Sequence, residues 1–214
     1  MTFGKSLRIH LTTVEDTLGT ASSNPDLHKE HIAANSKDRA KMKEELAALP
    51  AEDLEEKSKT GFSRTADGGP MLWDYQIKGF IKEAVNAVRE MPDSCVSKEK
   101  RLSKWSYKKT LDKLIMVGTL ADAKDRKLPL ILPEGAEIGE KVRPLRAETM
   151  RGERVALACS ETVPPGTQLS FQIILLDPRL EAGIREALDY GQWNGLGQWR
   201  SAGWGRFNWE EIQA

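Results

Sequence analysis

The stretch PPGTQLSFQIILLDPRLEAGIREALDYG, residues 164–191, decides the fold class because a strand pattern passes directly into a helix pattern. A Pro-Pro-Gly turn precedes residues 168–176, which predict a long apolar strand. Pro178 suits the first turn of a helix, where a missing N–H leaves no hydrogen bond unmade. The apolar residues of this helix recur at helical spacing on one inward face, at Leu180, Ile184, Ala187 and Leu188.

Four further segments read as strands. Residues 155–160 precede the Pro-Pro-Gly turn, so we expect a hairpin between Val155–Ser160 and Gln168–Leu176. Lys5–Thr13 alternates apolar and polar residues, as a half-buried strand does. The apolar run KLPLILP at 127–133 predicts a short strand, and WGRFNW at 204–209 predicts the last one.

The remaining pattern completes the fold prediction. DYQIKGFIKEAVNAVREM at 74–91 keeps the helical period and ends at Pro92. The charged segment 27–59 predicts two short helices broken near Pro50, which we interpret as an insertion. Without it the order is β, α, β, β, α, β. The sequence predicts an α+β fold: a ferredoxin-like or RRM-like βαββαβ domain with an added hairpin strand and a helical insertion.

Composition limits the class of protein. The chain has 214 residues, 39% hydrophobic and 30% charged, with a formal net charge of zero. These values indicate a single soluble domain over 1–214, with the insertion at about 27–59 and a basic segment at about 98–126. We see no signal peptide and no apolar run near the roughly 20 residues of a membrane span. Cys95 and Cys159 lack metal-ligand spacing, so we expect reduced thiols, a cytoplasmic protein and no metal or cofactor.

The loop GLGQWRSAGWGRF at 195–207 is the main candidate site. Glycine lets backbone N–H groups approach phosphate oxygens, arginine binds phosphate in a bidentate manner, and tryptophan stacks on bases. We therefore expect the loop to contact a nucleic-acid backbone. The alternative is a pair of turns whose tryptophans pack into the core, at Trp199, Trp204 and Trp209.

Two basic segments are weaker candidates. The extended stretch around Pro144 carries Arg143 and Arg146, whose side chains could splay toward one ligand. Its neighbouring cations are Lys141, Arg151 and Arg154, and the mixed charges also fit a salt-bridged loop. The run at 98–113 holds Trp105 and Tyr107 among lysines, which fits either base stacking or a solvated face.

Three motifs in order are similar to the RAMP superfamily of CRISPR-associated proteins: GGPMLWDYQIKGFIKEAV, VPPGTQLSFQI and GLGQWRSAGWGRF. The residues that match are Pro70, Ile77, Lys78 and Gly79, then Pro165, Gly166, Thr167 and Phe171, then Gly197, Arg200, Ser201, Gly203, Gly205 and Arg206. The sequence departs at WDYQ, where the family has PGSS. The family also has a cleaving acidic residue after the first strand, where Asp16 and Asp26 lie without the family's context.

The resemblance implies a non-catalytic, RNA-binding backbone-type subunit that assembles along a guide RNA with other CRISPR subunits or with itself. The RNA-binding residues would be Lys78, Arg143, Arg146, Arg151, Gly197, Arg200, Ser201, Gly203, Gly205 and Arg206. Two alternatives stay open. One is a RAMP-fold endoribonuclease that processes CRISPR RNA, with His28 and His31 as candidate general bases. The other is a phage-borne relative that interferes with CRISPR assembly. A ferredoxin-like domain that binds no nucleic acid is also compatible with the zero net charge.

Overall fold

The strand β1 (Lys5–Thr13) is the second strand from one edge of the larger sheet. It pairs antiparallel with β11 (Gln168–Leu175) on one side and β12 (Phe207–Glu211) on the other. β11 in turn pairs antiparallel with β7 (Ile115–Gly118). The order β12-β1-β11-β7 is that of a ferredoxin-like βαββαβ domain, so the predicted fold class is confirmed. This computed structural model describes residues 4–22, 59–149 and 152–212.

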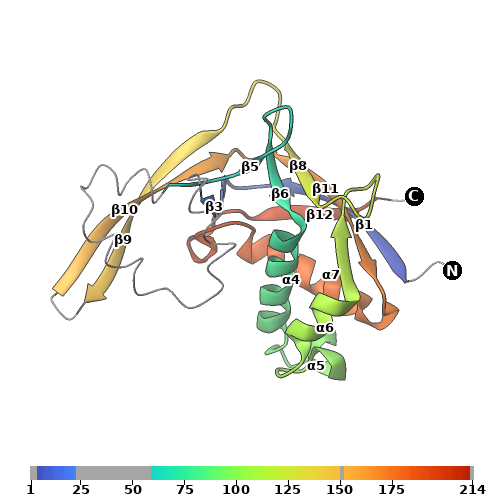
Figure 1. Cartoon of the computed structure of the whole chain (residues 1–214). Helices are drawn as coiled ribbons and strands as arrows, with labels where there is room; N and C mark the ends of the chain where they lie inside the picture. The colour runs from blue at the N-terminus through green and yellow to red at the C-terminus, as the bar shows by residue number, and fades with distance from the viewer. Residues whose placement is uncertain (1–3, 23–58, 150–151, 213–214) are drawn as a thin grey trace, which may run out of the picture.

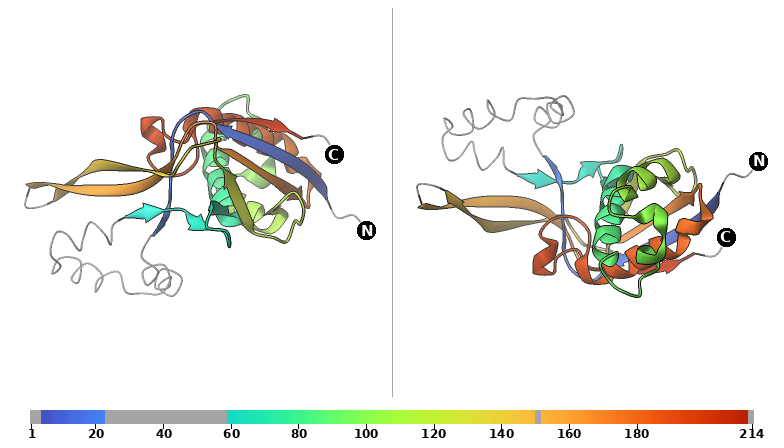
Figure 2. Two further views of the ribbon diagram at one scale, coloured as in Figure 1. Left: turned by 90° about the horizontal axis from the view of Figure 1, so that it is seen from above. Right: turned by 90° about the horizontal axis from the view of Figure 1, so that it is seen from below.

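Two helices cover one face of this sheet (Figures 1 and 2). They are α4 (Asp74–Val88) and α7 (Glu181–Asn194), and their apolar faces point inward as the helical spacing predicts. The two helices approach closely because Gly191 of α7 leaves room for aromatic rings. A Cβ at Gly191 would lie 2.2 Å from Phe207 Cζ, and the Phe207 ring meets Phe80 edge to face at 5.5 Å.

The apolar side of β1 and β11 forms the floor of the core. Alternate residues of both strands are buried, which follows from the period of two in a strand. The side chains that are fully enclosed there are Leu7, Ile9, Phe171, Ile173 and Leu175.

Besides β7, the strand β11 has another neighbour, which extends the larger sheet. β8 (Lys127–Ile131) pairs with the start of β11 and also with β6 (Pro70–Trp73), which pairs with β5 (Ser63–Arg64). The strand predicted at 127–133 is therefore confirmed. The strand β7, which completes the ferredoxin-like order, was not predicted.

The strand predicted at 155–160 pairs with a different strand from the one expected. β10 (Gly152–Val163) pairs along its length with β9 (Gly139–Thr149), and it belongs to the smaller sheet. β11 belongs to the larger sheet, so the prediction that Val155–Ser160 pairs with Gln168–Leu176 is wrong. The Pro-Pro-Gly turn carries the chain from one sheet to the other. The β9-β10 hairpin extends away from the helical layer (Figures 1 and 2).

Short elements connect these parts. The basic segment after α4 folds into α5 (Cys95–Lys98) and α6 (Tyr107–Leu114). The other short elements are β2 (Thr17–Leu18), β3 (Ala21–Ser22), β4 (Thr60–Gly61), η1 (Lys100–Leu102), η2 (Pro178–Leu180) and η3 (Arg200–Ala202). The helices expected at 27–59 lie outside the described residues, apart from position 59. Within the described ranges, no helix has the length and hydropathy needed to cross a membrane.

Candidate nucleic-acid interface

The Gly-rich loop begins where α7 ends at Asn194, and backbone hydrogen bonds hold it against the chain that follows β1. The Val14 N–H donates to the Arg206 carbonyl at 2.8 Å, and the Gly205 N–H donates to the Asp16 carbonyl at 2.9 Å. These bonds place residues 195–206 beside the first strand, at the edge of the larger sheet. The loop is thus bonded to the body of the fold, with Leu196 packed in the core and Trp199 partly exposed.

Two glycines of the loop are required by the protein's own backbone. Gly205 has φ +74°, and a Cβ there would lie 1.9 Å from the Leu196 carbonyl oxygen. Gly197 has φ +82°, and a Cβ would lie 2.5 Å from the Leu18 carbonyl oxygen. Only glycine fits such positive φ angles together with such close backbone contacts. The glycine pattern therefore has a structural cause, whatever the loop binds.

The tryptophans of the loop stack on each other beside the hairpin. The rings of Trp199 and Trp204 lie nearly parallel, with an interplanar angle of 5° and centroids 5.8 Å apart. Lys141 of β9 lies 5.0 Å from the centre of the Trp204 ring, and Arg143 lies 5.3 Å from that of Trp199. Positions 141 and 143 share a face of the strand, so the hairpin supplies one cation to each ring. Trp199 remains 37% exposed.

Arg143 ties the hairpin to the loop. Its side chain is buried, with 8% of the residue exposed, and it donates to Gln198 Oε1 at 2.5 Å. Burial lowers the pKa of this guanidinium below its ordinary value. Among the described residues the Arg143 Nε has no hydrogen-bond partner, and the same is true of the buried Nε of Arg206. A buried donor without a partner costs about 1–3 kcal/mol, so both guanidinium groups are held here at a cost to stability.

Two of the predicted loop residues, Gly197 and Arg200, line a second feature, a pocket of about 280 Å³ between the loop and α4. Arg200 lines it and pairs with Glu83 of α4. Gly197 and Gln76 also line it, and Gln76 accepts a hydrogen bond from the Trp73 N–H at the start of α4. Gln76 thus caps the helix in the WDYQ segment. Of the remaining two predicted loop residues, Ser201 is exposed and Gly203 lies beside the Arg206 guanidinium.

Lys78 lies on a different side of α4. Its ammonium contacts the sulfur of Met116 on β7, and the next lysine along this side, Lys82, pairs with Asp112 of α6. Gln76 and Glu83 face the loop instead. The structure therefore separates Lys78 from the Gly-rich loop, because adjacent helical positions point about 100° apart.

Most of the remaining predicted residues lie outside the described part of the chain. The backbone of Arg146 lies in β9, opposite Val155, and its side chain is not described. Positions 143 and 146 are an odd number apart in a regular strand, so one ligand on one face would meet only one of them. Arg151, His28 and His31 lie outside the described residues.

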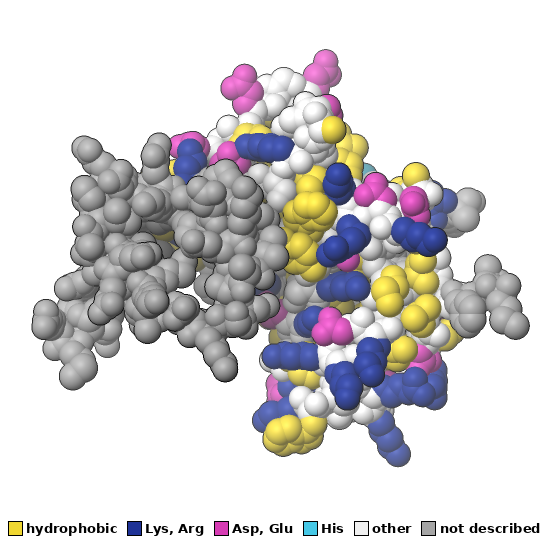
Figure 3. Space-filling view, viewed as in Figure 1, with side chains coloured by type: hydrophobic (Ala, Val, Ile, Leu, Met, Phe, Trp, Pro, Cys, Tyr) yellow, Lys and Arg dark blue, Asp and Glu magenta, His cyan; other side chains and the backbone are white. Residues whose placement is uncertain are grey.

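In the basic segment the two aromatic residues differ. Tyr107 is buried, with Arg89 stacked on its ring at 5.0 Å, whereas Trp105 is 93% exposed. Lysine and arginine side chains gather on the face that α4 and α6 form (Figure 3). Among the described residues there is no group of three His, Cys, Asp or Glu side chains that could hold a metal ion.

Sequence reasoning missed several members of the site. Gln198 and Glu83 contact the predicted arginines, and Thr20 and Gln76 line the pocket. No local pattern marks these residues, since segments far apart in sequence bring them together. The stack of Trp199 on Trp204 was also missed, because a positive φ at a tryptophan cannot be anticipated from spacing.

The topology defines the protein as a ferredoxin-like α+β domain that carries a long hairpin and a Gly-rich loop. No protein-family model matches the chain, and no curated protein matches it. Among solved structures, it is similar to a chain in the cryo-EM structure of the type III-B Cmr-beta bound to cognate target RNA. The TM-score is 0.53 at 11% identity, over 98% of this chain and 61% of that chain. A chain of a type IV-B CRISPR complex gives a TM-score of 0.46 at 11% identity, over 98% and 91% of the two chains.

Proposed function

We propose that this protein binds single-stranded RNA at the junction of its Gly-rich loop and its β9-β10 hairpin, as a non-catalytic subunit of a CRISPR ribonucleoprotein. In this proposal the RNA is a guide RNA, and the subunit is a cytoplasmic RAMP protein that assembles along it with other subunits or further copies. The class of ligand follows from the groups that meet at the junction.

One observation carries the proposal: stacked indoles and cationic side chains meet at one place, where the Trp199 ring and Lys141 are exposed. Trp199 offers a partly exposed ring, on which a base can stack. Lys141 lies over the Trp204 ring and Arg206 belongs to the same loop, and a phosphate oxygen can pair with such cations. A ligand with both flat rings and closely spaced anions is a single-stranded nucleic acid.

The comparisons support the same class of ligand. The fold matches that of a chain in a complex solved with its target RNA, although this chain spans 61% of that chain. The three motifs shared with the RAMP superfamily fall on the start of α4, the turn before β11 and the Gly-rich loop. Two of these three places line the junction or its neighbouring pocket.

Salt dependence of binding tests the assignment. We would titrate a fluorescein-labelled single-stranded RNA with the protein and follow anisotropy over a range of salt concentrations. Replacing Lys141 and Arg206 by alanine removes two cations from the junction. The slope of log K against log salt should fall by roughly 0.7 per lost phosphate contact, so by about one to two units.

The matched control removes two cations elsewhere. Lys113 of α6 and Lys127 of β8 are both exposed and lie outside the junction. The double variant Lys113→Ala, Lys127→Ala makes the same change in net charge and should leave the slope nearly unchanged. Equal slopes for both double variants would contradict the proposed site.

Purification from the host separates the alternatives. Bound RNA of uniform length on a large assembly is the result expected for a guide-binding subunit. Cleavage of RNA that is lost in His28→Ala or His31→Ala would instead establish the endoribonuclease. A monomer free of RNA that retains a CRISPR protein would establish the interfering interaction protein.

A further inference from the structure

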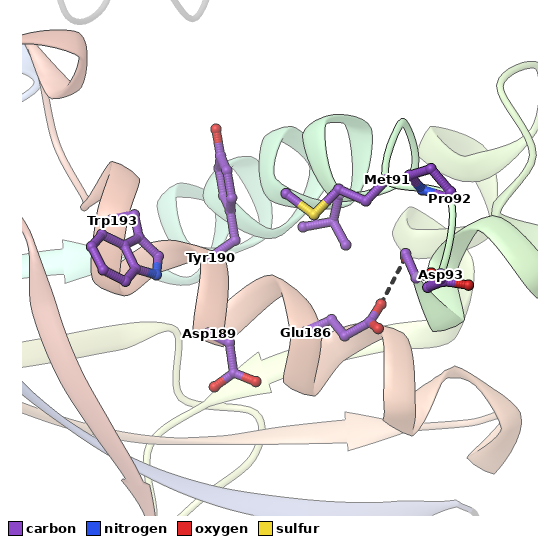
Figure 4. A pocket seen from close by; sticks show the side chains of 9 residues that line it. Met91, Pro92, Asp93, Glu186, Asp189, Tyr190 and Trp193 are labelled. Carbon is purple, nitrogen blue, oxygen red and sulfur yellow. Dashed lines mark hydrogen bonds between the residues drawn. The ribbon is translucent and has the colours of Figure 1, made fainter.

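A pocket of about 450 Å³ lies between the C-terminal end of α4 and the outer side of α7 (Figure 4). None of the residues that line it belongs to the Gly-rich loop or to the hairpin. Val88 and Tyr190 form its inner wall, while Met91 and Trp193 at its edge are 48% and 77% exposed. Exposed apolar side chains that flank a hollow mark a binding surface.

The same pocket is negatively charged. Its lining includes Asp93, Glu186 and Asp189, and no lysine or arginine. Glu186 accepts hydrogen bonds from the Ser94 hydroxyl and from two backbone N–H groups, at Cys95 and Val96. Burial raises the pKa of Glu186, but these hydrogen bonds outweigh it and hold the pKa below the ordinary value. A charged carboxylate repels phosphate, so the pocket fits an apolar group that has a cation beside it.

The chain itself displays such a group. Trp105 is 93% exposed between η1 and α6, and Lys104 precedes it directly. Lys108 and Lys109 follow on the first turn of α6 and are both exposed, with the Lys108 ammonium 5.9 Å from the centre of the Tyr107 ring. Trp105 and Trp193 are the two most exposed tryptophans of the described residues. Tryptophan and charged partners at the centre of a patch supply most of the binding energy in protein interfaces.

The pocket and Trp105 lie on the same end of the molecule. Ser94 of the pocket caps α5, which lies beside α6 in Figure 1, and η1 and Trp105 connect these two helices in the chain. A two-fold axis needs both halves of a contact on one surface of each copy, and it then forms the contact twice. We propose that two copies of the chain associate about such an axis, with Trp105 of each copy entering the acidic pocket of the other.

Size and charge set the expected strength of this dimer. A buried tryptophan contributes roughly 150–250 Å², so two of them supply about a quarter of a standard interface near 1,600 Å². Contacts between the α5 and α6 regions would have to supply the rest. We therefore expect a dissociation constant in the micromolar range that rises with salt, because the lysines beside Trp105 face the pocket carboxylates.

Sedimentation equilibrium of the full chain, freed of nucleic acid, tests the proposal. The wild type should show a dimer that dissociates on dilution. Trp105→Ala should weaken dimerisation at least tenfold and leave the affinity for single-stranded RNA unchanged. Trp199→Ala should weaken RNA binding and leave dimerisation unchanged. The two variants therefore distinguish a failure of the dimer proposal from a failure of the RNA site.

A charge exchange makes the test specific to the pocket. Lys104→Asp and Asp93→Lys should each weaken the dimer, and the double variant should restore much of it, since each copy again presents opposite charges. A chain that stays monomeric up to about 100 µM, well above a micromolar constant, would overturn the proposal. So would a dimer that Trp105→Ala leaves intact, or a Trp105→Ala variant whose defect is in RNA binding alone.

Discussion

Trp199 stacks on Trp204 while its own backbone holds a left-handed conformation, with φ +56° and ψ +32°. It is the one non-glycine residue with a positive φ in the described part of the chain. A bulky residue in this region costs of order 1–3 kcal/mol, and such strain persists where the surrounding structure determines it. In this conformation the Trp199 indole lies over Trp204 and beside Arg143 of the hairpin.

Replacing Trp199 by glycine should separate stability from binding. Glycine adopts a positive φ without strain, so the free energy of unfolding in urea should fall little or rise. RNA affinity should fall by about 10- to 100-fold, because a stacked base is worth about 1–3 kcal/mol. Trp105→Ala removes an exposed indole elsewhere and should leave RNA affinity at the wild-type value. Unchanged RNA affinity in Trp199→Gly would contradict a stacking role.

Gly205→Ala should destabilise the whole domain. A positive φ alone costs roughly 1 kcal/mol for alanine, and here the Cβ would also lie 1.9 Å from the Leu196 carbonyl oxygen. Gly68→Ala isolates the first cost, because Gly68 has φ +87° and no atom within 4 Å of its would-be Cβ. Urea denaturation should show a much larger loss for Gly205→Ala. Equal losses of unfolding free energy in the two variants would mean that the loop backbone shifts to make room for the Cβ at little cost.

Arg143 and Gln198 should couple the hairpin to the loop energetically. Their hydrogen bond is charge-assisted and partly buried, so a double-mutant cycle with alanine should give a coupling of about 1–3 kcal/mol in the free energy of unfolding. Val142 lies on the opposite face of β9 and is 56% exposed. A cycle between Val142→Ala and Gln198→Ala should give a coupling near zero. A similar value in both cycles would show that Arg143 does not join the two parts.

The fold could be predicted from the sequence where one face of an element is apolar. β1, α4 and α7 each bury such a face, and the pattern found all three. β9 was missed because it is rich in charged residues and contains Pro144. Proline argues against a central strand, but it is tolerated in an edge strand such as β9, which pairs with β10 on one side. β7 was missed because it is short and directly follows the basic helix α6.

The candidate site could be predicted only in part. The glycines and arginines of the loop are local signals, but the loop residues that the structure brings to Lys141 and Arg143 of the hairpin are its tryptophans. The direction of Lys78 depends on the rotation of α4 against the sheet, which tertiary packing decides. The hairpin register likewise decides that Lys141 and Arg143 share a face.

Glu186 should stabilise the fold in a pH-dependent manner. Its carboxylate accepts hydrogen bonds from the Cys95 and Val96 N–H groups and the Ser94 hydroxyl, which fixes the start of α5. The pKa of Glu186 in the folded protein lies below its ordinary value of about 4.3. Its contribution to the free energy of unfolding is therefore complete above that pH and is lost as the pH falls through the folded pKa. Glu186→Gln keeps the size but loses the charge, so it should cost about 1–3 kcal/mol near neutral pH.

The measurement is urea unfolding of both proteins from near neutral to acid pH. The difference between wild type and Glu186→Gln should be largest near neutral pH and should shrink toward zero in acid, since protonated Glu186 resembles glutamine in charge. Glu210→Gln, at an exposed position of β12, should show little difference at any pH. A gap for Glu186→Gln that stays constant across this range would mean that shape, and not the carboxylate charge, holds α5 against α7.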